Sequence, residues 1–176
     1  MGHFYLRSVE SRLLARSLVR LRTVDLSNAS LTTDQVTGLC QAIVEEKEGA
    51  VLEDLNLKNV YLRDVDGGLL AKAVVLLSRV GLASTRMTAD QVSRVLTGVT
   101  AGNSRLRTLD MSDLRLSSVD SQLLAGAVAR LRSVDIARTG LTAEQLTGLC
   151  RAAGQNQDGV VLGGVNTGGV DHGILP

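Results

Sequence analysis

The sequence predicts an α/β protein built as a curved solenoid, with parallel strands on its concave face and helices on its convex face. Three observations lead to this fold. Apolar and polar residues alternate over short stretches such as TVDLS, DLNLK and TLDMS, which is the period of a strand with one buried face. A Thr-x-x-Gln sequence, the pattern of a capping box that starts a helix, follows every second such stretch. The strand-and-helix pattern then recurs along the chain, as it does in stacked repeat proteins.

Two phrases alternate along the 176 residues, which we interpret as a single domain of repeats. The first phrase begins at Leu21, Leu77 and Leu131, and the second begins at Leu52, Leu106 and Leu162, so the steps between starts are 31, 25, 29, 25 and 31 residues. Residues 4–21 match residues 60–77, so residues 1–20 are expected to be a partial repeat from a longer array. Residues 162–176 are expected to be a degenerate terminal repeat, because GGVNTGG replaces core leucines there.

Apolar residues at helical spacing follow each capping box. The three boxes pair Thr32 with Gln35, Thr88 with Gln91 and Thr142 with Gln145. The apolar positions expected to be buried are Val36, Leu39, Cys40 and Ile43, then Val92, Val95, Leu96 and Val99, then Leu146, Leu149, Cys150 and Ala153. One such unit cannot bury its apolar face alone, and stacking the units makes a continuous core between sheet and helices.

The composition limits the kinds of core and partner that the chain can have. The hydrophobic fraction is 44% and the aromatic fraction only 2%, which predicts a core of aliphatic side chains. The formal net charge is +1, so no long-range field favours nucleic acid or an anionic membrane, and neither is expected as a partner. Two cysteines are too few for a disulfide framework, which favours a reducing, cytoplasmic setting.

The Leu-x-x-Leu-x-Leu core, the two alternating unit types and the helix in each unit resemble the ribonuclease-inhibitor class of leucine-rich repeats. The resemblance implies a horseshoe-shaped segment of the kind that forms the sensing arms of NOD-like receptors and the Ran GTPase-activating proteins. That class usually places Asn or Cys three residues after the third Leu, where the side chain caps carbonyl groups of a turn. This sequence has Ala29, Val60, Thr85, Leu114 and Thr139 there, so the turn backbone must be satisfied in another way.

No group of residues has the spacing of a catalytic, cofactor or metal site. Cys40 and Cys150 occupy the same place in equivalent helices, and Leu96 takes that place in the helix between them, so both cysteines are expected to be buried core residues that tolerate replacement by Leu. His3 and His172 lie near opposite ends of the chain, too far apart in the repeat order to share a metal. The Gly-rich stretch at residues 159–169 lacks the Gly-Lys-Ser/Thr ending of a phosphate-binding loop.

The outward positions of the strands form the candidate binding surface. Alternation points their side chains away from the core, on the concave face, where repeat proteins place their contacts. Equivalent positions form three columns, of which the middle one contains Asp25, Asn56, Gly81, Asp110, Asp135 and Asn166. The candidate partner-binding residues are Asp25, Asp54, Asn56, Lys58, Arg79, Asp110 and Asp135. Two interpretations stay open: the carboxylates of this face meet basic groups of a protein partner, or short polar residues merely solvate a sheet.

The fold and its resemblance predict a non-enzymatic protein-recognition module, similar to the ligand-sensing arm of a cytosolic innate immune receptor. One alternative is a GTPase-activating regulator on the same scaffold, which would need a projecting Arg or Asn beside the nucleotide. Another is a self-assembling repeat unit. The first full strand, around residues 24–26, is expected to leave an open sheet edge with an apolar flank, which predicts a homodimer through this N-terminal edge.

Overall fold

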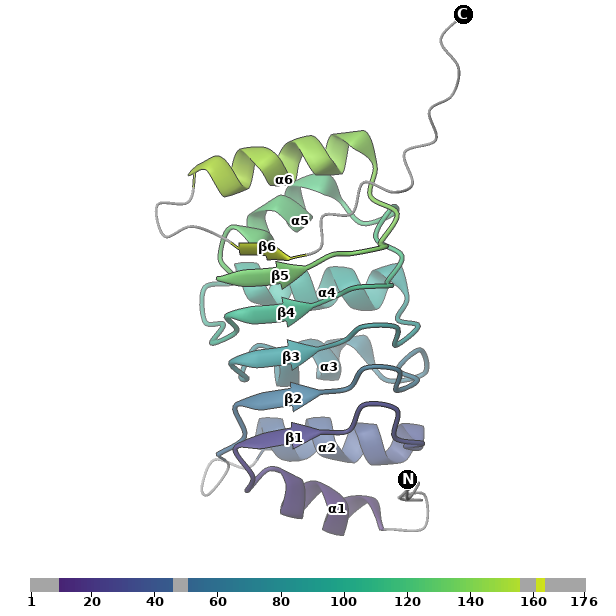
Figure 1. Ribbon diagram of the computed structural model, residues 1–176. Coiled ribbons are helices and arrows are strands. Elements are labelled where there is room, and N and C mark those ends of the chain that lie inside the picture. Colours follow the sequence, from purple (N-terminus) through teal and green to yellow (C-terminus); the bar gives the residue numbers. More distant parts are fainter. Residues whose placement is uncertain (1–9, 46–50, 156–160, 164–176) are drawn as a thin grey trace, which may run out of the picture.

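The chain folds into one layer of parallel strands and one layer of helices that covers a single face of the sheet (Figure 1). The computed structural model describes residues 10–45, 51–155 and 161–163, and within these it has six strands and six helices. In chain order they are α1 (Ser11–Leu18), β1 (Thr23–Asp25), α2 (Thr33–Glu45), β2 (Asp54–Asn56), α3 (Gly67–Val74), β3 (Arg79–Gly81), α4 (Ala89–Thr100), β4 (Thr108–Asp110), α5 (Ser121–Val128), β5 (Ser133–Asp135), α6 (Ala143–Gln155) and β6 (Val161–Gly163).

The strands pair in the order in which they occur in the sequence, from β1 to β6. Each parallel pair is joined through one helix, and the register of the first five strands is the one predicted from the repeats. Val24 pairs with Leu55, Leu55 with Val80, Val80 with Leu109 and Leu109 with Val134. Equivalent residues of successive units therefore form straight columns across the sheet, and the expectation of repeated strand–turn–helix units is confirmed for these strands.

The sixth strand begins earlier than the sequence pattern predicts. The alignment of Leu162 with the first leucine of the second phrase predicts that residue 166 extends the middle column, next to Asp135. Instead Asp135 pairs with Gly163 and Val134 pairs with Leu162, a displacement of three residues. Val161 and Leu162 are a better strand sequence than the glycine-rich residues after them, because glycine has no side chain to pack and loses more conformational freedom. Asn166 lies outside the described residues.

The core between the two layers is aliphatic, as the composition predicts. The largest side chains that are less than 2% exposed are all leucines except for Met111. They come from strands, turns and helices of successive units and belong to one continuous cluster. Burying a leucine side chain stabilises the fold by about 1.5–3 kcal/mol relative to leaving it exposed. A stack of such units can therefore be stable without large aromatic rings.

All three predicted capping boxes are present. In the first, the Thr32 N–H donates to Oε1 of Gln35 while the Gln35 N–H donates to the Thr32 hydroxyl oxygen. The same two bonds recur at the starts of α4 and α6. Helices α3 and α5 of the other unit type begin differently, with an aspartate N-cap: Asp66 accepts from the Leu69 N–H and Asp120 from the Leu123 N–H, both at 2.7 Å. Every helix from α2 to α6 is thus capped by a side chain.

The glutamines of the second and third boxes also join their units to the preceding ones. Nε2 of Gln91 donates to the carbonyl oxygens of Leu62, Arg63 and Val65, at 2.7–3.2 Å. Nε2 of Gln145 donates to the carbonyls of Leu116 and Val119 in the same way. Both side chains are buried, so these bonds form away from water. The amide thereby satisfies carbonyls in the turn that leads into the neighbouring helix.

Threonine hydroxyls cap the turns where the repeat class usually has Asn or Cys. Thr85 donates to the Leu82 carbonyl and Thr139 to the Ile136 carbonyl, both at 2.7 Å and both buried. At the equivalent Ala29, Val60 and Leu114, which have no polar side-chain group, the residue's own N–H donates to the corresponding carbonyl, that of Leu26, Leu57 or Met111. The turn carbonyl is therefore bonded by a threonine hydroxyl in two units and by a backbone N–H in the other three, without the Asn or Cys of the similar repeat class.

The prediction of burial is correct for Cys40 and wrong for Cys150. Cys40 is only 2% exposed, and removal from water raises the pKa of its thiol to about 12. Cys150 is exposed. The two residues have the same place in α2 and α6, but α2 packs against α3 as well as α1, whereas α6 packs against α5 and lies at the end of the helix row (Figure 1). Among the described elements, no helix covers the surface of α6 that corresponds to the one α3 covers on α2.

The first unit has apolar groups in contact with solvent. β1 is the first strand of the sheet and pairs on one side with β2. Leu13 of α1 is 63% exposed and Leu21, just before β1, is 52% exposed. An exposed apolar flank beside β1 agrees with the sequence, and the homodimer through this edge stays a prediction.

Candidate functional site

A shallow groove of about 350 Å³ crosses the face of the sheet that the helices leave uncovered. It extends over β1 to β4 and is lined by their outward side chains. Five of the seven predicted partner-binding residues lie in its wall: Asp25, Asp54, Asn56, Arg79 and Asp110. Lys58 and Asp135 are not part of it. The structure therefore brings most of the predicted residues together on one surface.

Lys58 does not belong to a strand, because each strand is only three residues long. The sequence places Lys58 in a third outward column with Ser27, Ala83, Ser112 and Ala137. These residues follow the strands, and three of them (Ala83, Ser112 and Ala137) are buried. The prediction of an outward third column is wrong for these three residues, whereas Lys58 is exposed although it lies outside the strand. The backbone turns there, because the next residue of each unit has a positive φ between 56° and 61°.

The residues of the middle column are the last residues of their strands. Oδ1 of Asp25 accepts a hydrogen bond from the Ser27 N–H, and Oδ1 of Asp135 accepts one from the Ala137 N–H, at 2.8 and 2.9 Å. Asn56 does the same for the Lys58 N–H at 3.1 Å, and Asp110 accepts from both the N–H and the hydroxyl of Ser112. Each side chain thus closes a local turn of the Asx type, which fixes its orientation. The same residues therefore have a structural role beside any role in binding.

The hydrogen bonds at Asp25 stabilise the charged form of its carboxylate. The hydroxyl of Ser27, followed by its N–H, lowers the pKa of Asp25 below its ordinary value. Asp25 is consequently ionised at neutral pH. The strand face presents a fixed negative charge on β1, and the Asp110 and Asp135 side chains of β4 and β5 have the same turn geometry.

Gly81 interrupts the middle column and leaves room for its neighbour. A Cβ atom at this position would lie 2.6 Å from Oδ1 of Asn56, which is closer than such contacts allow. Gly81 has no side chain to close its own turn, and the Asn56 side chain extends over this part of β3. At Gly81 the groove is thus lined by backbone and by Asn56, while Asp54 and Arg79 line it in the preceding column.

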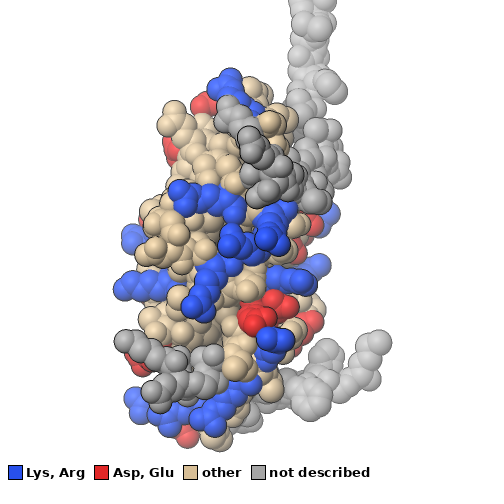
Figure 2. Space-filling model, turned by 90° about the vertical axis from the view of Figure 1, so that its left-hand side faces the viewer, with Lys and Arg blue, Asp and Glu red and all other residues tan. Residues whose placement is uncertain are grey.

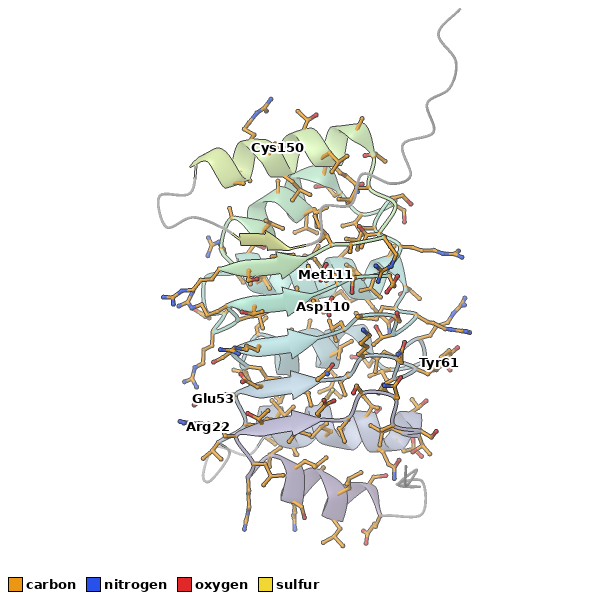
Figure 3. The ribbon with its side chains drawn as sticks, in the orientation of Figure 1. Arg22, Glu53, Tyr61, Asp110, Met111 and Cys150 are labelled. Atoms are coloured by element: carbon orange, nitrogen blue, oxygen red, sulfur yellow. The ribbon has the colours of Figure 1, made fainter. Side chains whose placement is uncertain are left out.

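Two ion pairs lie where β1 to β3 begin. Arg22 contacts Glu53 at 3.1 Å, and Figure 3 shows both side chains at that edge of the sheet. Arg79 lies 3.9 Å from Asp54 across the groove wall, with 69% of its side chain exposed. Exposed pairs of this kind contribute at most about 1 kcal/mol, so Arg79 and Asp54 can separate to meet other partners at little cost.

A second set of polar residues follows the turns at the other edge of the sheet, where the strands end. Nδ2 of Asn59 donates to Oδ1 of Asn28, and Arg138 donates to both carboxylate oxygens of Asp113, at 2.6 and 2.8 Å. The hydrogen bonds from Arg138 lower the pKa of Asp113, and the Asp113 carboxylate in turn raises the pKa of Arg138. These contacts join neighbouring units. Sequence reasoning missed them, although each residue falls three positions after the last residue of its strand.

Two other hollows, similar to each other in volume and larger than the groove, lie away from the strand face. One, of about 680 Å³, lies between α5 and α6 and is lined mainly by small and polar residues such as Gly126, Gly148 and Ser121. The other, of about 640 Å³, lies beside the start of α4 and includes Arg63, Arg86 and Arg115. Neither hollow contains any of the predicted partner-binding residues.

Among the residues that the structure describes, no three His, Cys, Asp or Glu side chains gather in a way that could hold a metal ion. No described helix has the length and apolar character needed to span a membrane. His3 and His172 lie outside the described residues.

Comparison with protein-family models and with curated proteins gave no match to this chain.

Proposed function

We propose that the chain is a non-enzymatic recognition module of the leucine-rich-repeat type, similar to the ribonuclease-inhibitor class, which binds a protein on the concave strand face of a curved solenoid. The observation that carries this proposal is the groove of about 350 Å³ across β1 to β4, lined by five of the predicted residues. By its resemblance the chain would act as the ligand-sensing arm of a cytoplasmic innate immune receptor.

The chemistry of the groove favours a protein surface over a small molecule. The groove is open, and Asp25, Asp54 and Asp110 line it beside Arg79 and Asn56. Small-molecule sites are usually enclosed clefts that bury most of the ligand. Side chains held at regular intervals by strand register suit a large partner that contacts several units at once.

The excess of carboxylates predicts that the partner presents basic groups to this face. Asp110 and Asp135 are adjacent in register on β4 and β5, and each is oriented by its own turn. Attraction between such exposed charges and a basic partner is screened over about 8–10 Å at ordinary ionic strength. Binding should therefore weaken as salt is added.

We expect the double substitution Asp110→Asn and Asp135→Asn to weaken capture of the partner while leaving the fold intact. Asn keeps the oxygen that closes each turn, as Asn56 shows at the same place in β2. Only the negative charge is lost, so the change in unfolding free energy should stay within about 0.5 kcal/mol. The measurement is the amount of partner retained by the immobilised chain over a salt series, with thermal unfolding of the variant alongside.

The matched control replaces two exposed carboxylates away from the strand face, Asp34→Asn and Asp64→Asn, with the same change in net charge. This control should capture as much partner as the wild type. Equal capture by the wild type and the strand-face variant would contradict the proposed role of the carboxylates.

A further inference from the structure

Four arginines gather at the edge of the sheet where the strands begin. Figure 2 looks at this edge and shows basic side chains spread over most of it, interrupted by a small acidic area. Arg105 and Arg107 precede β4, and Arg130 and Arg132 precede β5. All four are exposed. We call this group the arginine edge.

The backbone places two of these arginines directly side by side. The Arg132 N–H donates to the Arg107 carbonyl at 2.8 Å, so the two residues are neighbours in one column of the parallel ladder. The same column continues through Ser78 and Glu53 to Arg22, by equivalent hydrogen bonds of 2.8–2.9 Å. Neighbouring strand segments in such a ladder are about 4.8 Å apart, so adjacent side chains in a column interact.

The two ends of this column differ in charge. In the first two units Arg22 lies beside Glu53 and pairs with it at 3.1 Å. In the fourth and fifth units arginine lies beside arginine, and within residues 10–45, 51–155 and 161–163 no carboxylate forms an ion pair with either of them. Like charges opposite each other on neighbouring strands destabilise a sheet.

The second pair adds to the positive charge at the same place. Arg105 and Arg130 lie two positions before Arg107 and Arg132, and neither forms an ion pair within the described ranges. Nη1 of Arg130 lies 3.8 Å from where a Cβ atom would stand on Gly102, so this side chain extends over the loop that leads to Arg105. Four positive charges thus share a small area, and a local arrangement that is unfavourable without compensation is expected mainly at functional sites.

We infer that the arginine edge binds an acidic segment of the protein partner, whose carboxylates supply the missing negative charge. This inference rests on the proposed function, because the edge borders the strand face and would extend the contact made there. Guanidinium groups bind carboxylates through two parallel hydrogen bonds, which suits arginine better than lysine for this task. Glu53 and Asp54 lie in the second unit, two units away, and their charge limits the favourable area to a short acidic segment.

The surroundings favour a protein over a nucleic acid. Binding of single-stranded nucleic acid usually combines basic groups with aromatic rings on which bases stack. Tyr61 is the one aromatic residue in the described ranges, and Figure 3 shows it at the opposite edge of the sheet from Arg22 and Glu53. Within the part of the chain that the structure describes, no stacking platform therefore accompanies the arginine edge.

The test uses the full chain and fluorescence anisotropy with a labelled hexaglutamate peptide. We expect Arg107→Glu to weaken peptide binding by at least about tenfold, because it removes one guanidinium and adds a repelling carboxylate. The same substitution should raise the melting temperature by about 1–4 °C, because it replaces a like-charge neighbour of Arg132 with an opposite one, as at Arg22 and Glu53. A residue that matters only for stability would not show this combination.

The matched control is Arg115→Glu, which makes the same change in net charge at the opposite edge of the sheet and should leave peptide affinity unchanged. The inference is overturned if hexaglutamate fails to bind the wild type, if Arg107→Glu binds it equally well, or if an oligothymidylate of similar charge binds more tightly than the peptide. It is also overturned if Arg107→Glu lowers the melting temperature. None of these outcomes bears on the strand-face carboxylates, whose own substitutions test the proposed function separately.

Discussion

Replacing Gln91 with Leu is expected to lower the free energy of unfolding by about 2–4 kcal/mol. The buried amide donates to three carbonyl oxygens of the preceding unit, those of Leu62, Arg63 and Val65. Its oxygen also accepts from the Thr88 N–H, which begins α4. Leucine has a similar volume but can make none of these bonds, so it leaves carbonyls unsatisfied away from water. Urea unfolding of the wild type and the variant measures the difference.

The matched control is Gln122→Leu, a glutamine exposed on α5, which should change the free energy of unfolding by no more than about 0.5 kcal/mol. A loss at Gln91 as small as the loss at Gln122 would show that the glutamine amide does not hold neighbouring units together.

The variant Gln91→Glu separates the roles of the two ends of the amide. One carboxylate oxygen of the introduced glutamate can still accept from the Thr88 N–H. The other oxygen replaces the amide NH₂ and faces carbonyl oxygens, which repel a negative charge. The pKa of the introduced carboxyl in the folded state is therefore raised above its unfolded value of about 4.3. The folded protein then binds more protons than the unfolded chain in the window between these two pKa values. Stability relative to the wild type should therefore fall as pH rises through that window, and be higher near pH 4 than near pH 7.

Labelling by a thiol reagent is expected to distinguish the two cysteines by several orders of magnitude in rate. Burial raises the pKa of Cys40 from its ordinary 9.0 to about 12, which lowers its thiolate fraction about 1000-fold before access is considered. Cys150 is exposed and should react within the time of a normal experiment. Mass spectrometry of peptides after timed labelling at pH 8 gives both rates.

The variant Cys150→Ser provides the control, because its remaining thiol should stay unlabelled until denaturant is added. Fast labelling of Cys40 in the folded protein would contradict the packing of α2 against α3. Cys150→Leu should be tolerated less well than the repeat pattern alone predicts, because it exposes an apolar side chain on α6.

Much of the fold follows from the sequence because the repeats constrain it many times over. The period-two alternation around Leu55 and Leu109 and the Thr-x-x-Gln boxes each recur. Aligning the repeats therefore determines the strand and helix positions in a unit even where its own pattern is weak. The register of β1 to β5 is accordingly as predicted. Where the pattern decays, the prediction fails: β6 begins at Val161, three residues early, because glycines had replaced the apolar residues on which the alignment depends.

The site was harder to predict, because outward position does not reveal what else a side chain does. Alternation identified Asp25 and Asp110 as outward, and both line the groove. It could not show that their oxygens close turns, since this depends on where each strand ends. It also extended the strands too far, which placed Lys58 on the sheet when it belongs to a turn. The buried role of Gln91 was missed because the capping box already explained its presence.

The most direct test of recognition through the strand face is a photocrosslinking measurement on two positions of neighbouring elements. A benzoylphenylalanine would replace Arg79, which is exposed in the groove on β3, or Lys72, which is exposed on α3 behind the sheet. In an extract of the cells that express the chain, we expect position 79 to give a crosslinked protein adduct that position 72 does not. An adduct from position 72 with none from position 79 would place the partner on the helices and contradict recognition by the strand face.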